Sequence, residues 1–111
     1  HFYIGVRRNG LLGDNYTYPF VLKACGMMFG LWEGREVHGE VVKGGFQWDL
    51  FVRNGLIGMY CRCSQIGWAQ ALFDGFCGKD LVSWNLMLGG YVRCGDMGEA
   101  QKLFDEMPER D

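Results

Sequence analysis

The hydrophobic positions in the last third of the chain follow two successive helical patterns. From residue 81 to 91, large apolar side chains recur with the spacing of one helix face: Leu81, Trp84, Leu88 and Tyr91. Residues 93–95 interrupt this pattern, and a second one runs to residue 107. Asp96 followed by Glu99 forms a capping-box sequence, which predicts that the second helix begins there. Pro108 predicts its end.

The same pattern occurs one unit earlier. Residues 49–79 and 80–110 align without a gap at an offset of 31, and 13 of the 31 positions are identical. Among the identical residues are an asparagine, an arginine and a cysteine, at Asn54/Asn85, Arg62/Arg93 and Cys63/Cys94. A fixed period of this length is typical of a solenoid, in which each unit buries its apolar face against its neighbours.

A longer and more divergent unit precedes these two. We expect its first helix over residues 15–25, a turn over 27–30 and its second helix over 32–43. The predicted fold is therefore an all-α solenoid of antiparallel helix pairs, without β-strands. We expect it to span 1–111 as the end of one repeat (1–14) and three full repeats (15–49, 50–80 and 81–111).

Composition restricts the function less than the repeat does. The 18 glycines of the 111 residues include several inside predicted helices, which predicts marginal stability. The net charge of −2 gives no general signal for polyanion binding, and no apolar run is long enough to span a membrane. The five cysteines are odd in number and two of them recur at the offset. We therefore expect small buried side chains in a reducing compartment rather than a disulfide framework.

Aromatic side chains at helical spacing are expected in the core. These are Tyr60, Phe73, Trp84, Tyr91 and Phe104. Trp48 and Trp68 lie near unit boundaries, where we expect partial exposure.

Two short motifs suggest chemistry and are set aside. Asn15-Tyr16-Thr17 matches a glycosylation sequon, but a helix start explains it better in a chain with reduced cysteines. His38-Gly39-Glu40 matches half of a zinc deaminase motif, and the P-C-x-x-C half is missing. We therefore predict no catalytic residues, no metal site and no cofactor, and expect the chain not to be an enzyme.

The last unit carries a specific family resemblance. Val-Ser-Trp-Asn, Cys-Gly-Asp and Ala-Gln-Lys-Leu-Phe-Asp-Glu-Met-Pro-Glu-Arg-Asp closely resemble the pentatricopeptide repeat (PPR) proteins of plants. Units 50–80 and 81–111 resemble S repeats of the P-L-S subclass, and the 35-residue unit 15–49 resembles an L repeat. The resemblance covers the whole chain.

The resemblance implies sequence-specific binding of single-stranded RNA, with one base per repeat recognised by two side chains. The fifth and last residues of each unit give the pairs Pro19 with Asp49, Asn54 with Asp80, and Asn85 with Asp111. An asparagine paired with an aspartate resembles the family's uracil code, so a UU step is expected, whereas Pro19 has no polar group to offer. Residues that would sandwich a base are Tyr16, Phe51 and Val82, and those that would contact phosphate are Arg62 and Arg93.

The resemblance also implies a place and partners. We expect the RNA-recognition part of an organelle RNA-editing or RNA-processing factor, in chloroplast or mitochondrion, with any deaminase domain and targeting peptide outside this fragment. The L-like unit is expected to contact a protein editing partner. The rival class is a protein-interaction scaffold of tetratricopeptide type, whose 34-residue period and W-x2-L-G-x2-Y pattern are not found here.

Overall fold

The computed structural model of the chain describes residues 15–108. The predicted end of a repeat at 1–14 and Asp111 lie outside these residues. Six α-helices follow one another: α2 Thr17–Met27, α3 Leu31–Gly44, α4 Leu50–Arg62, α5 Ile66–Asp74, α6 Leu81–Arg93 and α7 Met97–Glu106. Between residues 15 and 108 the structure contains no β-strand.

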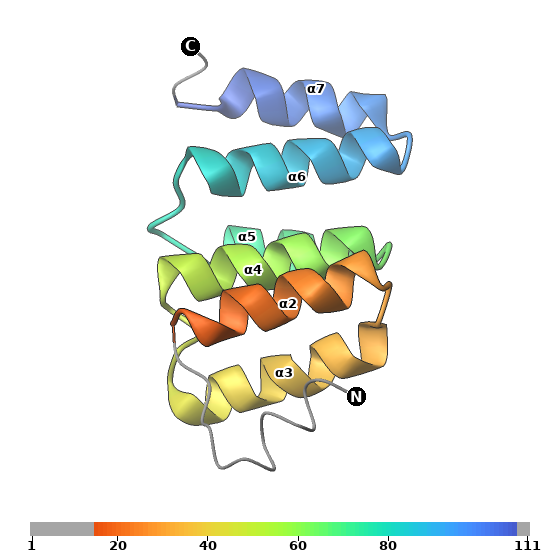
Figure 1. The fold of residues 1–111 in the computed structure, drawn as a ribbon. Coiled ribbons are helices and arrows are strands. Elements are labelled where there is room, and N and C mark those ends of the chain that lie inside the picture. The colour runs from red at the N-terminus through yellow and green to blue at the C-terminus, as the bar shows by residue number, and fades with distance from the viewer. Residues whose placement is uncertain (1–14, 109–111) are drawn as a thin grey trace.

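The helices form a stack of antiparallel pairs (Figure 1). α2 packs on α4 and α4 packs on α6, while α3, α5 and α7 each pack on the first helix of their own pair. The first helices α2, α4 and α6 therefore share one face, and α5 lies behind α4 (Figure 1). This arrangement confirms the predicted all-α solenoid.

The same backbone turn joins the two helices of each pair. One residue in each turn has a positive φ: 55° at Phe29, 64° at Ser64 and 83° at Gly95. The residue after each of them donates its backbone N–H to a carbonyl five residues earlier, as in Gln65 to Tyr60 at 2.8 Å and Asp96 to Tyr91 at 3.0 Å. This is a Schellman-type helix end, for which glycine is best suited. Only the last unit has glycine at this position.

Aspartates cap three of the helices. The Asp49, Asp80 and Asp96 carboxylates accept the backbone N–H of the residue three positions later. The predicted capping box at Asp96 is only half formed, because the backbone N–H of Asp96 is used in the preceding turn and Glu99 lies 3.8 Å from Lys102 instead. The reciprocal box occurs at Asp80, where the side chain of Ser83 returns the bond.

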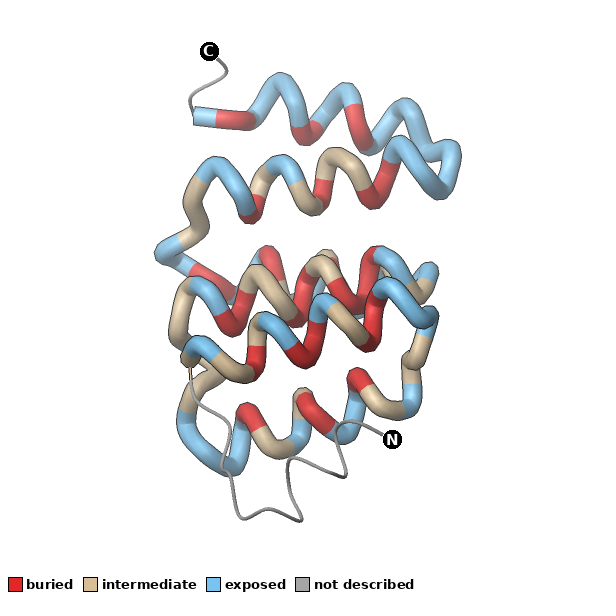
Figure 2. Tube along the Cα trace, viewed as in Figure 1, coloured by how far each residue is buried: buried red, intermediate tan, exposed pale blue. Residues whose placement is uncertain are grey.

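The buried residues line the faces where helices meet, whereas most of α7 is exposed (Figure 2). Tyr60, Phe73 and Tyr91 are buried as expected, and Trp84 is half-buried. Phe104 was expected in the core but is 41% exposed. It lies on the last helix, which no described helix covers on its outer side. Trp48 and Trp68 are exposed, as predicted.

Two glycines inside helices lie where neighbouring helices approach closely. This packing role explains their presence in spite of their low helix propensity. A Cβ built on Gly90 would lie 2.8 Å from Cys61 Sγ and 2.9 Å from Ile66 Cδ1. A side chain at this position of α6 would therefore displace side chains of α4 and α5. A Cβ on Gly34 of α3 would likewise overlap the Met59 side chain of α4. The helix-interior glycines are thus partly packing residues, which offsets their cost in propensity.

Arg53 is a buried cation at the position that Trp84 occupies in the next unit. Its guanidinium donates to the carbonyls of Gln47 (3.2 Å) and Leu72 (3.0 Å). It also lies 4.8 Å from the centre of the Trp48 ring and 5.5 Å from that of Phe76. Arg53 therefore ties the start of α4 to the end of α5 by replacing its hydration with carbonyl and aromatic contacts.

All five cysteines are free. Cys25 and Cys61 are buried, and their location in the apolar interior raises the pKa of each thiol to about 11. The recurring pair was expected to be buried, but Cys63 is half-buried and Cys94 is exposed, because both lie at the capped ends of their helices. Among the described helices, none has the length and apolar character needed to cross a membrane.

Candidate nucleic-acid interface

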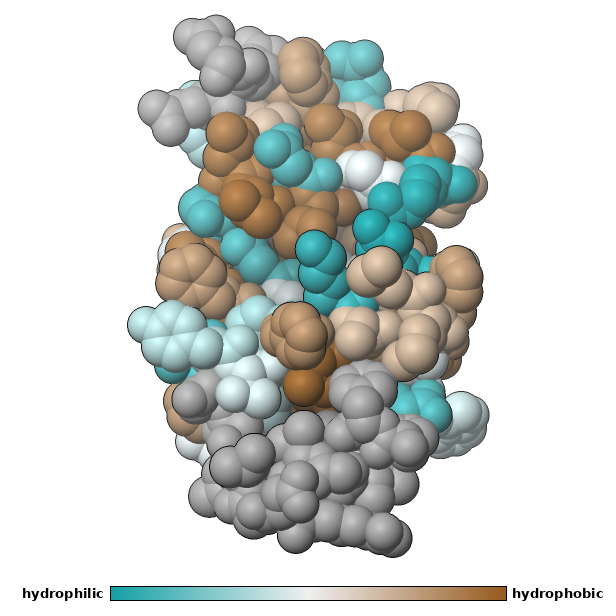
Figure 3. All heavy atoms as spheres, viewed as in Figure 1, coloured by the Kyte–Doolittle hydropathy of each residue, from teal (hydrophilic) through white to brown (hydrophobic). Residues whose placement is uncertain are grey.

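A groove runs along the shared face of the first helices. One hollow lies between α2, α4 and α6 and is lined by Pro19, Phe51, Asn54, Arg62 and Val82, among other residues. A second hollow continues it between α4 and α6 and is lined by Arg62, Val82, Asn85 and Arg93. Figure 3 shows hydrophilic side chains gathered over α4 and α6 on this face, between hydrophobic areas. The two asparagines that recur at the offset of 31 thus line one continuous groove.

Asn54 is fixed by two residues of the following unit. Its Nδ2 donates to Asp80 Oδ1 at 3.2 Å, and its Oδ1 accepts a hydrogen bond from Ser83 Oγ at 2.6 Å. An ionised carboxylate only accepts hydrogen bonds, so the nitrogen of the amide must face Asp80 and the oxygen must face Ser83. Each of these two amide atoms keeps one further hydrogen-bonding position. The residue pair predicted from the sequence is in direct contact.

Asp80 stays ionised in this arrangement. Partial burial raises its pKa, but hydrogen bonds from the Ser83 backbone N–H and the Asn54 amide outweigh burial and hold the pKa below its usual range. The carboxylate therefore has two tasks: it caps α6 through the Ser83 N–H at 3.1 Å, and it orients Asn54.

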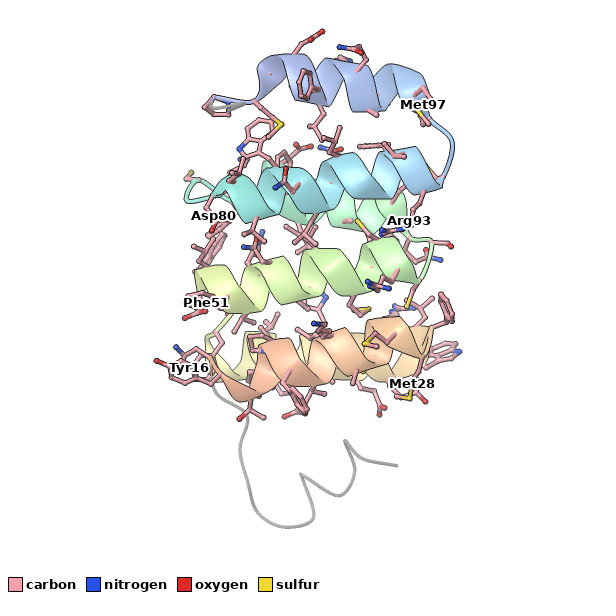
Figure 4. All side chains as sticks on the ribbon, turned by 45° about the horizontal axis from the view of Figure 1, so that its top comes forward. Tyr16, Met28, Phe51, Asp80, Arg93 and Met97 are labelled. Carbon is pink, nitrogen blue, oxygen red and sulfur yellow. The ribbon has the colours of Figure 1, made fainter. Side chains whose placement is uncertain are left out.

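Apolar side chains flank the asparagines. Phe51 is 62% exposed and Val82 is 52% exposed, although both line the groove. Figure 4 shows Tyr16, Phe51 and Asp80 at the same end of the stacked helices, where α2, α4 and α6 begin. An exposed aromatic ring beside a fixed amide can stack on a nucleobase while the amide contacts the edge of that base.

Arg62 and Arg93 lie at the other end of the same helices. Each is the last residue of its helix, α4 or α6, and each is exposed at the groove. Figure 4 shows Arg93 at the end of α6 opposite to Asp80. A guanidinium there is free to meet phosphate as a fork of hydrogen-bond donors. Lys23 of α2, which sequence reasoning did not select, also lines the groove.

The other predicted pairs differ from the first. Asn85 is exposed in the second hollow, and its partner Asp111 lies beyond the described residues. Pro19 lines the first hollow but offers no hydrogen-bonding side-chain atom. Asp49 caps α4 by accepting the Val52 N–H at 3.1 Å. The three predicted residue pairs, each at the boundary between one unit and the next, are therefore not equivalent.

Ser83 is the residue that sequence reasoning missed. It is fully buried and has no exposed surface, so nothing in its hydrophobic pattern suggested a role near the groove. Its position three residues after Asp80 was the available signal, because serine at that spacing can complete a reciprocal helix cap.

The two motifs set aside from the sequence lie in different surroundings. Nδ1 of His38 lies 2.7 Å from the Tyr60 hydroxyl, in a packed contact between α3 and α4. Asn15 lies in the turn before α2. No cluster of three or more potential metal ligands occurs within residues 15–108.

A stack of antiparallel helix pairs with a groove along the first helices defines an α-solenoid repeat protein. Comparison with known proteins gives the family. Residues 82–111 match the family model of the PPR repeat. A pentatricopeptide repeat-containing protein of Arabidopsis thaliana, named chloroplastic/mitochondrial, is 49% identical over 72 residues, which is 65% of this chain and 11% of that relative. The chain belongs to the pentatricopeptide repeat family.

Further relatives carry the same name. One from Arabidopsis thaliana, named chloroplastic, is 41% identical over 83 residues, covering 75% of this chain and 16% of the relative. Another from the same plant is 40% identical over 84 residues, covering 76% of this chain and 14% of the relative. The chain thus spans a small part of the length of the relatives it matches. The organelle names support the expected localisation.

Proposed function

We propose that this chain binds single-stranded RNA in a sequence-specific way, with one base per repeat, along the groove of α2, α4 and α6. Members of the family generally bind RNA in organelle RNA processing, and no enzymatic role is proposed for these repeats. The observation that carries the proposal is the contact between Asn54 and Asp80. It gives an amide of fixed orientation at the edge of an open groove, which is what recognition of a base edge requires.

The roles along the groove follow from chemistry. Asn54 and Asn85 contact base edges, Phe51 and Val82 flank the bases, and Arg62 and Arg93 contact phosphates. Tyr16 would flank the base of the unit at 15–49, where Pro19 and Asp49 supply no amide and recognition is weak. Two adjacent asparagine units favour a UU step, with the indifferent L-like unit on its 5′ side if the RNA runs parallel to the chain. Asn85 and Asp111 are proposed to form the second pair.

The biological setting is part of the same proposal. The chain is the recognition part of a P-L-S subclass factor that acts in RNA editing or processing in the chloroplast or mitochondrion. In this proposal the chemistry of editing is assigned to another domain or protein.

The test uses the full-length protein that carries these repeats. Its binding to RNAs that differ only at two adjacent positions is measured by fluorescence anisotropy. The expected result is tighter binding to UU than to AA, CC or GG, and loss of that preference in Asn54→Ala. Equal binding to all four RNAs would refute the proposed code, and binding to none would refute RNA recognition by these repeats.

A second candidate function is a contact with a protein partner through the L-like unit. The observation that favours it is the exposed apolar surface at the turn between α2 and α3. Met28 is 59% exposed, Phe29 is 73% exposed and Trp32 is 75% exposed. Figure 4 shows Met28 at the end of α2 opposite to Tyr16. A pull-down in which Trp32→Ala keeps RNA binding but loses an editing partner would support this function.

A further inference from the structure

Ser83 touches the candidate recognition pair from inside the protein. Its hydroxyl oxygen accepts the backbone N–H of Asp80 at 3.2 Å, which leaves its single hydrogen to be donated. The Asn54 oxygen at 2.6 Å is a closer acceptor than the Asp80 carboxylate at 3.1 Å. The hydroxyl proton therefore goes to Asn54. Because Ser83 is fully buried, it makes this bond without contacting the groove itself.

We propose that Ser83 is a positioning residue that sets the orientation of the Asn54 amide and thereby favours uracil over cytosine. This inference rests on the function proposed above. It adds a third residue to the recognition of one base, and that residue comes from the interior of the following repeat.

The chemical reason lies in the symmetry of the amide. An asparagine side chain presents a donor and an acceptor, and a rotation of 180° exchanges them. Uracil carries a donor at N3 between two carbonyl acceptors, whereas cytosine carries an acceptor at N3 beside an amino donor. For a base held in one place, one amide orientation therefore matches uracil and the other matches cytosine.

Asp80 opposes the rotation directly, and Ser83 adds to this preference by a closer hydrogen bond in the observed orientation. In the rotated amide, the Asn54 oxygen would face the ionised Asp80, acceptor against acceptor, and the nitrogen would face Ser83. The hydroxyl of Ser83 then loses its acceptor at 2.6 Å and can turn its proton only to the Asp80 carboxylate at 3.1 Å. Because its oxygen already accepts the Asp80 backbone N–H, one lone pair is left for the amide nitrogen. Asp80 thus binds the nitrogen of the Asn54 amide and Ser83 binds its oxygen, so each residue fixes only one of the two polar atoms of the amide.

The preceding junction offers an internal comparison. Val52 occupies in unit 50–80 the position that Ser83 occupies in unit 81–111, and it is fully buried as well. It has no hydroxyl, and the residue in the place of Asn54 is Pro19, which has no amide to orient. At these two junctions, the buried hydroxyl occurs where an amide lines the groove and is missing where none does.

Ser83 also completes the helix cap at Asp80, so the experiment must separate orientation from stability. The full-length protein and its variants are each incubated with a pool of single-stranded RNA of random sequence, and the bound RNAs are sequenced. This probe reports the base preference at every recognised position, which a change in overall stability alone does not alter selectively.

In Ser83→Ala we expect the preference for uracil over cytosine to fall by about 3- to 10-fold at one position, the loss of one net hydrogen bond. Preferences at the other positions should stay unchanged. Ser83→Thr and Ser83→Val introduce side chains of nearly equal shape, so they should affect folding alike. Ser83→Thr keeps a hydroxyl and should retain the preference, whereas Ser83→Val should lose it. Val52→Thr is the matched control and should change no base preference.

Each outcome is decisive. If Ser83→Ala keeps the uracil preference, or if Ser83→Thr and Ser83→Val behave alike, the positioning role of Ser83 is wrong, while the proposed RNA binding stands. If the unmodified protein shows no uracil preference at any position, the proposed recognition code is wrong and the inference falls with it.

Discussion

The rings of Phe73 and Trp84 meet edge to face, with their centroids 5.0 Å apart and their planes at 86°. Phe73 lies in the last turn of the second helix of one unit, and Trp84 lies in the first helix of the next. Lys79 Nζ lies 4.9 Å from the centre of the same Phe73 ring. This cluster joins neighbouring units by apolar contact, and Phe104 occupies the position of Phe73 in the last unit.

Removal of the Trp84 ring should weaken this junction. We expect Trp84→Ala to lower the free energy of unfolding by about 2–4 kcal/mol, from lost burial and a lost aromatic pair. Phe104→Ala is the matched control, because Phe104 is 41% exposed, and should cost about 1 kcal/mol or less. Urea unfolding followed by circular dichroism measures both. Equal losses in the two variants would contradict this account of the junction.

The turn at Ser64 should accept glycine with a gain in stability. Ser64 has a φ of 64°, a region that L-residues occupy at a cost. Ser64→Gly is expected to stabilise the chain by roughly 0.5–1 kcal/mol. Gly95→Ser should destabilise it by a similar amount, because Gly95 has a φ of 83°. There is open space around Gly95, so the backbone conformation and not a steric clash is the cause. Thermal unfolding of the two variants checks both signs, and a rise in melting temperature for Gly95→Ser would be inconsistent with the strain argument.

Acid should destabilise the chain partly through His38. Burial lowers the pKa of this imidazole, and the charges of Arg53 and Arg35 lower it further. The unfolded imidazole binds a proton near pH 6.5, whereas the folded one does so only at lower pH. The stabilisation is therefore complete above about pH 6.5 and is lost as the pH falls towards the pKa of the folded state.

His38→Gln should flatten this dependence. The free energy of unfolding, measured by urea titration at pH 7 and at pH 5, should differ less between the two pH values in the variant than in the unmodified chain. An unchanged difference would show that His38 does not titrate as its surroundings indicate.

Substitution of the second asparagine should change specificity alone. In the full-length protein, Asn85→Ser is expected to weaken the preference for UU while leaving the salt dependence of binding nearly unchanged, because Asn85 carries no charge. Binding to UU and CC RNAs at several salt concentrations measures both quantities. A uniform loss of affinity for every RNA would assign Asn85 a structural role instead.

Substitution of the second arginine should do the reverse. With the proposed phosphate contacts by Arg62 and Arg93, the slope of log K against log salt is expected to include about −1.4 from these two residues, at ~0.7 per contact. Arg93→Ala should lower the affinity for all RNAs and reduce the magnitude of the slope by about 0.7. The base preferences should remain. An unchanged slope would mean that Arg93 does not meet phosphate.

The features that the sequence could predict are those that repeat. The offset of 31 predicted the helix pairs and placed Asn54 and Asn85 on one face, because a solenoid places equivalent residues on one face. The pairing of Asn54 with Asp80 was implied by the family resemblance. Phe104 was mispredicted since periodicity identifies an apolar face but not whether another helix covers it. The capping box was expected at Asp96 and found at Asp80, because the local sequence does not show which backbone N–H the preceding turn already uses.

Contacts between non-equivalent residues were beyond this reasoning. Ser83 reaches Asn54 across 29 positions, and nothing in the period relates the two. Arg53 stands where the next unit has Trp84 and is nonetheless buried, because two carbonyls and two aromatic rings surround its guanidinium. Such contacts depend on three-dimensional packing, which neither spacing nor composition specifies.

The second helices differ in length more than the first helices do. α4 and α6 both have 13 residues, whereas α3 has 14 and α5 has 9. The extra residues of the longer unit therefore lie on the side away from the groove. An insertion or deletion in a second helix leaves the first helices, and the groove residues that they carry, in place. Repeats of unequal length can in this way keep the same spacing between the residues proposed to contact successive bases.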